Sequence, residues 1–203
     1  MEQYAHARER HVQLHRTDAL PVVGKVSNFQ RDLSASDATV TGEKLLARLH
    51  KQFPMALSIR RAPKENDMIG ADYWIELRHG QFRSIDVKVR REDWSLRGKP
   101  EIALEIWSNV ERQKPGWALD ESKLTDYVLF YWLETDRSYL VDFRQLQVAT
   151  RANLEKWNCA ARSGKQKTAH ATGYYSSQVV YVSVAELQRA IAESAVIEDR
   201  RAA

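Results

Sequence analysis

Two alternating runs joined by a glycine-containing turn constrain the fold of this chain more than any other feature. They cover residues 72–77 and 83–89, and the turn is Arg-His-Gly at 78–80. Alternation of apolar and polar residues is typical of half-buried β-strands, and the short connection makes the two runs the arms of a hairpin. The sequence therefore predicts an apolar face formed by Tyr73, Ile75, Leu77, Ile85, Val87 and Val89, and a polar face formed by Asp72, Trp74, Glu76, Ser84, Asp86 and Lys88.

The length of the turn decides which residues face one another. A three-residue turn with its glycine in the left-handed conformation pairs Leu77 with Gln81 and sets Asp72 directly opposite Asp86. A two-residue turn would mix apolar and acidic side chains on one face, so the pattern favours the longer turn. Opposed residues have Cβ atoms about 5 Å apart, and two carboxylates this close repel unless a cation lies between them. Such a pair suits Mg²⁺, and Lys88 stands beside it.

The remaining patterns predict a chain in which helices and strands alternate. Helical periodicity or capping patterns indicate helices over residues 38–53, 120–132 and 144–157 and a last helix opened by Ser183 and Glu186. Further strands are expected over residues 101–107, 138–143 and 179–184. We therefore expect an N-terminal arm over residues 1–37 and one α/β (α+β) domain over 38–203. Its αβββαβ core, about 38–143, would hold a central mixed sheet flanked by helices, and an αβα extension would follow over 144–203.

Composition limits the class of protein. A chain of 203 residues with 43% hydrophobic and 29% charged residues is ordinary for one folded, water-soluble domain. The lone Cys159 excludes an intramolecular disulfide and a cysteine-based zinc site, and no apolar run is long enough to span a membrane. We therefore expect a cytoplasmic protein without a membrane partner. The 31 Lys and Arg against 27 Asp and Glu give a net charge of +4, which permits a polyanionic partner without requiring one.

The order of the acids and the lysine carries a family resemblance. A helix with an acid, Glu43, precedes Asp72 and the Asp-x-Lys triplet at 86–88, an arrangement that resembles the PD-(D/E)XK nuclease superfamily with its restriction-endonuclease-like fold. The resemblance covers residues 41–143. It implies that Asp72 and Asp86 are the two acids of the motif and that Lys88 is its lysine. Glu43 corresponds to the helix acid that many members add to the metal shell. Ala71 replaces the proline of the motif name, and Asp86 takes the variant acid that many members fill with Glu.

The resemblance implies a magnesium-dependent nuclease. Such an enzyme hydrolyses DNA phosphodiester bonds, internally or from an end, with a metal-activated water, and Mn²⁺ can substitute for Mg²⁺. Glu105, on the third predicted strand, is a further candidate metal ligand. Candidate contacts to the nucleic-acid backbone are the basic residues Arg90, Arg91, Arg97, Lys99 and Lys123. Members of this fold often pair so that two strands can be cut, so a homodimer is expected.

Two other interpretations stay open. In the first, a catalytically inactive protein of the same fold binds nucleic acid or a protein partner through its basic rim. In the second, the fold assignment fails and the acidic face simply contacts another protein. The presence of both acids and the lysine in one register favours the enzyme.

Overall fold

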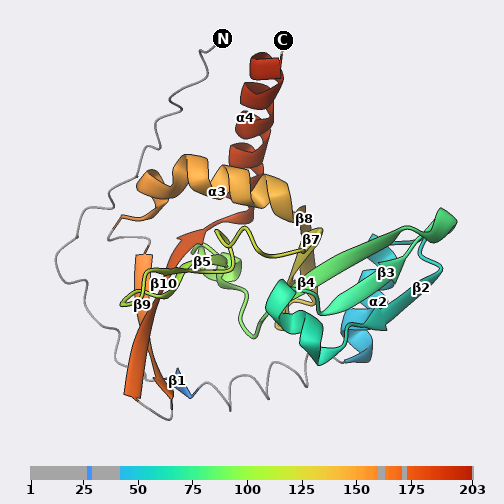
Figure 1. The fold of residues 1–203 in the computed structure, drawn as a ribbon, viewed down its shortest axis with the longest axis horizontal. Helices are drawn as coiled ribbons and strands as arrows, with labels where there is room; N and C mark the ends of the chain where they lie inside the picture. Colours follow the sequence, from blue (N-terminus) through green and yellow to red (C-terminus); the bar gives the residue numbers. More distant parts are fainter. Residues whose placement is uncertain (1–26, 29–41, 160–162, 171–172, 203) are drawn as a thin grey trace, which may run out of the picture.

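The hairpin predicted from the alternating pattern lies at the centre of one of two five-stranded β-sheets (Figure 1). A computed structural model describes residues 27–28, 42–159, 163–170 and 173–202. The first sheet has the strand order β2-β3-β4-β7-β8, and the second has the order β1-β9-β10-β5-β6. In the first sheet β4 and β7 are parallel and the other neighbours are antiparallel. The predicted mixed α/β class and mixed sheet are therefore confirmed.

The bounds of the elements are as follows. The first sheet contains β2 (Ser58–Arg61), β3 (Tyr73–Glu76), β4 (Phe82–Arg90), β7 (Tyr127–Trp132) and β8 (Arg137–Asp142). The second contains β1 (Ser27–Asn28), β5 (Ile102–Asn109), β6 (Lys114–Pro115), β9 (Ser163–His170) and β10 (Gly173–Val182). The α-helices of the described residues are α2 (Glu43–Gln52), α3 (Phe143–Trp157) and α4 (Val184–Ala202), and the 3-10 helices are η1 (Lys64–Ile69), η2 (Arg78–Gly80) and η3 (Trp94–Arg97).

The turn between β3 and β4 sets the register that the sequence predicts. The Leu77 N–H donates to the Gln81 carbonyl oxygen at 2.8 Å, so these two residues close the three-residue turn. Gly80 has a φ of 68°, the left-handed conformation that the predicted turn requires. His79 is left-handed as well, with a φ of 62°. The predicted pairing of the two arms is therefore confirmed.

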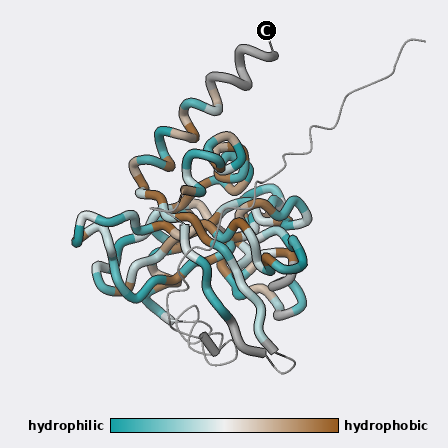
Figure 2. The backbone as a smooth tube through the Cα atoms, turned by 90° about the vertical axis from the view of Figure 1, so that its left-hand side faces the viewer, coloured by the Kyte–Doolittle hydropathy of each residue, from teal (hydrophilic) through white to brown (hydrophobic). Residues whose placement is uncertain are grey.

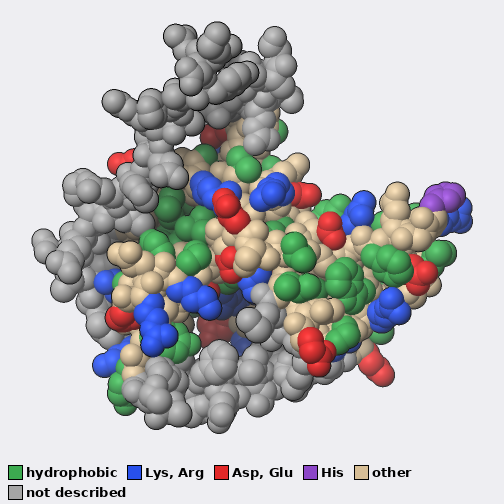
Figure 3. Space-filling view, viewed as in Figure 1, with side chains coloured by type: hydrophobic (Ala, Val, Ile, Leu, Met, Phe, Trp, Pro, Cys, Tyr) green, Lys and Arg blue, Asp and Glu red, His purple; other side chains and the backbone are tan. Residues whose placement is uncertain are grey.

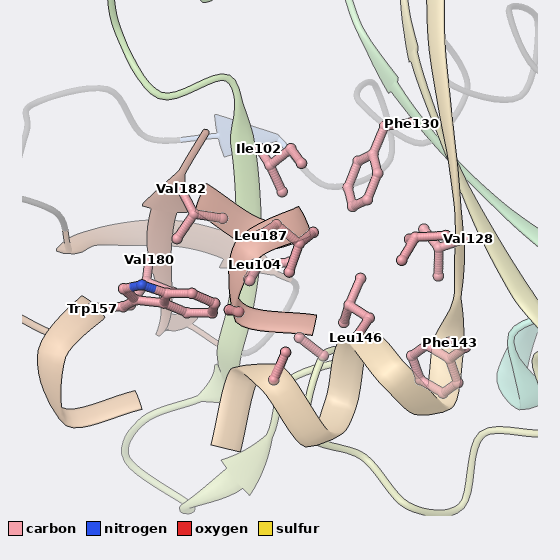
Figure 4. Packing of buried hydrophobic residues seen from close by; sticks show 14 of the residues in the cluster. Ile102, Leu104, Val128, Phe130, Phe143, Leu146, Trp157, Val180, Val182 and Leu187 are labelled. Carbon is pink, nitrogen blue, oxygen red and sulfur yellow. The ribbon is translucent and has the colours of Figure 1, made fainter. Parts of the chain in front are cut away.

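Two apolar clusters lie on opposite faces of the first sheet. On one face, Leu45 and Leu49 of α2 pack on the residues that form the predicted apolar face of the hairpin. The other face packs against β5, β10, α3 and α4, whose apolar side chains point toward one another (Figure 4). Hydrophobic residues are accordingly concentrated in the middle of the molecule (Figure 2). The two sheets therefore share one of the two clusters, and α2 covers the outer face of the first sheet.

Strand β7 contributes to both clusters. Val128, Phe130 and Trp132 belong to the cluster between the sheets, whereas Leu129 and Tyr131 belong to the cluster under α2. All five side chains are at most 1% exposed. A strand buried on both faces has a continuous apolar run instead of an alternating one, and such a run is easily mistaken for a buried helix. The helix predicted over 120–132 is therefore wrong, because residues 127–132 form a central strand.

The predicted order αβββαβ is corrected in three further places. β2 precedes the hairpin and was not predicted. The strand expected at 101–107 forms β5, which belongs to the second sheet and not to the sheet of the hairpin. The C-terminal extension contains two strands, because β9 and most of β10 occupy the region expected to be a loop. The restriction-endonuclease-like arrangement stays a proposal.

Other expectations agree with the structure. α2 and α3 confirm the helices predicted at 38–53 and 144–157 within the described residues, and the Glu186 N–H donates to Ser183 Oγ (3.1 Å) at the start of α4. The arm predicted for residues 1–37 lies outside the described residues apart from 27–28, which form β1 beside β9. In the described part of the chain, no helix combines the length and apolarity needed to cross a membrane.

A buried carboxylate fixes the segment that follows β4. Asp93 is 1% exposed and accepts hydrogen bonds from Arg137 Nε and Nη2 (both 2.9 Å), Thr135 Oγ1 (2.8 Å) and Ser95 Oγ (2.6 Å). The Arg137 guanidinium also lies over the Trp132 ring, 4.1 Å from its centroid. Asp93 is the N-cap of η3, so this network holds η3 against the turn between β7 and β8.

Asp93→Asn is expected to lower stability near neutral pH and to weaken the effect of acid on stability. Burial by itself would raise the pKa of Asp93, but hydrogen bonds from Ser95, Arg137 and Thr135 lower it from its usual 3.8 to about 2. Because the folded-state pKa lies below the unfolded one, this stabilisation is complete above about pH 4 and is lost as the pH falls toward about 2. With allowance for solvent screening it amounts to between about 1 and 2 kcal/mol.

Urea unfolding of the wild type and the variant, at several values between about pH 2 and 6, measures this difference. The gap in unfolding free energy should narrow on acidification. A gap that stays constant over this range would contradict the assignment of the low pKa to Asp93.

Candidate active site

The two acids of the hairpin lie opposite each other where β3 begins. The pairing of Tyr73 with Ile85, continued by one residue, sets Asp72 opposite Asp86, as the turn length predicts. The Asp72 N–H donates to the Ile85 carbonyl oxygen (2.8 Å), and Asp72 Oδ2 accepts from the Val87 N–H (2.7 Å). The Asp72 carboxylate is therefore held against the backbone of β4.

Asp86 and Lys88 are neighbours on the face of β4 that points away from α2. Lys88 Nζ lies 2.8 Å from Asp86 Oδ2, and Asp86 is only 7% exposed. Burial by itself would lower the pKa of Lys88, but the charge and hydrogen bond of Asp86 and the charges of Asp72 and Glu105 raise it above its usual value. Lys88 is therefore a protonated ammonium in the electrostatic field of three carboxylates.

Glu105 reaches this group from the second sheet. It lies in the middle of β5, half buried, and its Oε2 accepts from the Trp117 N–H at 3.4 Å. Burial raises the pKa of Glu105, against the opposing effects of the Trp117 N–H and of three lysines, of which Lys88 acts most strongly. The site thus joins two sheets, whereas the sequence led us to expect all its strands in one.

A segment after β6 covers the site closely. Lys88 Nζ lies 4.9 Å from the centroid of the Trp117 ring, a cation–π contact. A Cβ at Gly116 would collide with the backbone carbonyl oxygen of Glu105, so this close approach requires glycine. Neither Gly116 nor Trp117 was predicted to belong to the site. The Pro-Gly pair at 115–116 was the available signal, because it marks a turn next to a strand.

The predicted backbone-binding residues have different surroundings. Arg90 and Arg91 are exposed at the end of β4, two and three residues beyond Lys88. Lys123 lies near the acids, where its charge acts on Glu105. Arg97, by contrast, pairs with Glu134 at 3.2 Å, and the exposed Lys99 follows η3. The structure therefore brings Arg90 and Lys123 near Glu105, with Arg91 next to Arg90 in the chain, and leaves Arg97 and Lys99 on the surrounding surface.

Glu43 lies apart from the other predicted residues. It is exposed at the start of α2, which covers the opposite face of the sheet from the one that carries Asp86 and Lys88. The sheet therefore separates this helix from the ion pair. The structure gives no support to Glu43 as a member of the site.

The donor set fits a hard divalent cation. The candidate ligands are all carboxylate oxygens, and Mg²⁺ is commonly bound through one or two carboxylates while water completes its shell. Asp72 and Asp86, opposed in register, meet this requirement. Among the residues that the structure describes, no three His, Cys, Asp or Glu side chains form a metal-binding cluster. A cation here would therefore be held mainly by the two opposed acids and by water.

Comparisons with known proteins find no match to the chain among family models, curated proteins or solved structures.

Lys88→Met is expected to raise the pKa of Glu105 further. The ammonium of Lys88 is among the groups that oppose the effect of burial on Glu105, so its removal leaves that effect less balanced. Carbon-detected NMR titration of the glutamate carboxyl groups measures this change. Lys99→Met, which removes the same charge from an exposed position, serves as the matched control and should leave the Glu105 titration unchanged. An unchanged Glu105 titration in Lys88→Met would show that the two residues are not in electrostatic contact.

Proposed function

We propose that this protein is a magnesium-dependent nuclease that hydrolyses DNA phosphodiester bonds. One observation carries the proposal. The Lys88 ammonium lies 2.8 Å from the Asp86 carboxylate and within the field of Asp72 and Glu105, on one face of a mixed sheet. Two acids opposed in register beside a lysine are the residues on which the PD-(D/E)XK resemblance depends, and their arrangement supports that resemblance.

Asp72 and Asp86 would hold the metal, with Glu105 next to them. A bound Mg²⁺, or Mn²⁺ in its place, supplies Lewis acidity to the scissile phosphate and lowers the pKa of a water ligand. The hydrogen bond from Val87 to Asp72 orients one carboxylate before any ligand arrives, so little reorganisation is needed.

Lys88 has the properties needed to stabilise developing negative charge. Its raised pKa keeps the ammonium protonated at neutral pH, and Trp117 limits its movement from one side. A compact ammonium next to a phosphate offsets charge on the oxygens as the bond to the leaving group breaks, or orients the attacking water. Arg90 at the end of the same strand and Arg91 directly after it supply positive charge for the flanking backbone.

A second function is favoured by a specific observation. Among the described residues no three His, Cys, Asp or Glu side chains are placed so that they could hold a metal ion together, and the Asp86 carboxylate is already paired with Lys88. These features suit a catalytically inactive protein of the same fold that binds nucleic acid through its basic residues. The homodimer stays a prediction for either function.

Asp86→Asn and Lys88→Met should each lower the rate of DNA hydrolysis by at least about a hundredfold, because each removes a charge that the transition state requires. The assay follows cleavage of labelled single-stranded, duplex and branched DNA in the presence of Mg²⁺ or Mn²⁺. Glu76→Gln is the matched control. Glu76 lies on the same face of the same hairpin but accepts a hydrogen bond from Ser58 Oγ (2.8 Å) at the distant end.

Thermal unfolding of each variant separates loss of activity from loss of fold. Cleavage that persists in both site variants would rule out these residues as the catalytic group. A wild-type protein that binds DNA but cuts none of these substrates would establish the inactive binding protein instead.

A further inference from the structure

A cavity of about 330 Å³ begins at Arg90, two residues beyond Lys88, where the end of β4 faces the second sheet. Its lining comes from the end of β4, from the segment that leads into η3, and from β5, β9 and β10. It includes Arg90, Arg91, Trp94, Ala103, Gln166 and Tyr181. Lys and Arg side chains gather over the region of β5, β9 and β10 on the face shown in Figure 3. A volume of this size is within the range of sites that hold a small organic group.

An exposed aromatic platform forms one wall of the cavity. Trp94 is 39% exposed, and its ring lies 5.7 Å from that of Tyr181 with an interplanar angle of 31°. The platform is held in place from behind, because the neighbouring Asp93 is the buried N-cap that binds Arg137. A large ring that is both exposed and fixed can bind another flat ring without first losing conformational freedom.

The two arginines of the cavity are not paired with its two acids. These acids are engaged elsewhere: Glu101 accepts from Arg137 Nη2 (3.3 Å), and Glu92 lies 3.9 Å from Arg97. Within the described part of the chain, the two arginines at the end of β4 have no acid within ion-pair distance. Arginine guanidinium groups with free donors are suited to phosphate oxygens.

Arg90 connects the cavity to the candidate active site along β4. Asp86, Lys88 and Arg90 alternate along β4, so their side chains leave the same face of the strand, and about 7 Å separates each from the next. Tyr181 of the aromatic platform and Glu105 of the site both act electrostatically on Arg90. Arg90 therefore lies between the aromatic platform and the acids.

We propose that this cavity binds one unpaired nucleotide next to the scissile phosphate, with its base stacked on Trp94 and its phosphate bound by Arg90 and Arg91. The substrate would then be nucleic acid that is single-stranded at this position. A paired base inside a duplex keeps both faces covered by its neighbours and cannot reach the platform. This inference rests on the proposed function in taking nucleic acid as the ligand and in placing the scissile phosphate at the acids.

Binding in a metal-free buffer with EDTA tests the inference without any cleavage. The probes are a fluorescently labelled oligothymidylate of about ten nucleotides and an abasic oligomer of the same length, followed by fluorescence anisotropy. Trp94→Ala should weaken binding of the oligothymidylate between about 5-fold and 100-fold, because stacking of one base is lost. Binding of the abasic oligomer should not change, since it has phosphates but no bases.

Three further variants sharpen the test. Trp94→Phe should recover most of the lost affinity, because it restores a ring at the same position. Leu96→Ala is the matched control, since Leu96 is 64% exposed on the same short helix but does not line the cavity. Arg91→Gln should weaken both probes and reduce the slope of affinity against salt concentration by about one phosphate contact.

Equal weakening of both probes by Trp94→Ala, or no weakening of either, would overturn the inference, as would a wild-type protein that binds neither probe. Each of these results leaves the hydrolysis assay with Asp86→Asn and Lys88→Met as the separate test of the proposed function. Loss of hydrolysis with normal, Trp94-dependent oligothymidylate binding would remove the nuclease proposal and keep the unpaired-nucleotide site.

Discussion

The register of the β3–β4 hairpin determines the chemistry of both faces of the first sheet. Side chains alternate along a strand, so a slip of one residue would turn Asp86 and Lys88 into the apolar cluster under α2 and turn Ile85 and Val87 out of it. Such a slip forfeits roughly 1.5–3 kcal/mol for each large apolar side chain that leaves the core. The left-handed conformation of Gly80 permits the turn length that gives the observed register.

The hairpin could be predicted from the sequence because its signals are local. Strand β7 could not be predicted, because its burial on both faces depends on elements that are distant in the sequence. One face of the hairpin packs under α2 and the other lies toward the polar site, so the two arms alternate. β7 instead supplies Phe130 to one cluster and Leu129 to the other, so its sequence shows apolar residues at every position. Only knowledge that both of its faces are covered distinguishes such a strand from a buried helix. The same limit explains why β5 was expected beside the hairpin, since sequence periodicity identifies a strand but not its neighbours.

The residues of the candidate site likewise divide into those that local sequence patterns could bring together and those that they could not. Asp72, Asp86 and Lys88 lie on one hairpin, so alternation and turn length suffice to bring them together. Glu105 was a candidate from its residue type and strand, but its electrostatic interaction with Lys88 depends on how the two sheets pack, which no local pattern specifies. Gly116 matters because its missing side chain lets the chain approach β5, and this role is visible only in three dimensions.

The charges along β4 connect the site to the cavity beside it. Lys88 lies in the field of three carboxylates, and burial raises the pKa of Glu105 against the opposing charges of three lysines. In the proposed enzyme a divalent cation held by Asp72 and Asp86 would add positive charge at this point of the strand. Two residues beyond Lys88 the charge is already positive, because Arg90 has no acid in ion-pair contact within the described residues. In the proposed enzyme, a nucleic-acid backbone lying along β4 would meet the charge of a bound cation at the acids and the charge of the arginine side chains at the end of the strand. Because the two ends of this surface differ, they would orient a polyanionic ligand.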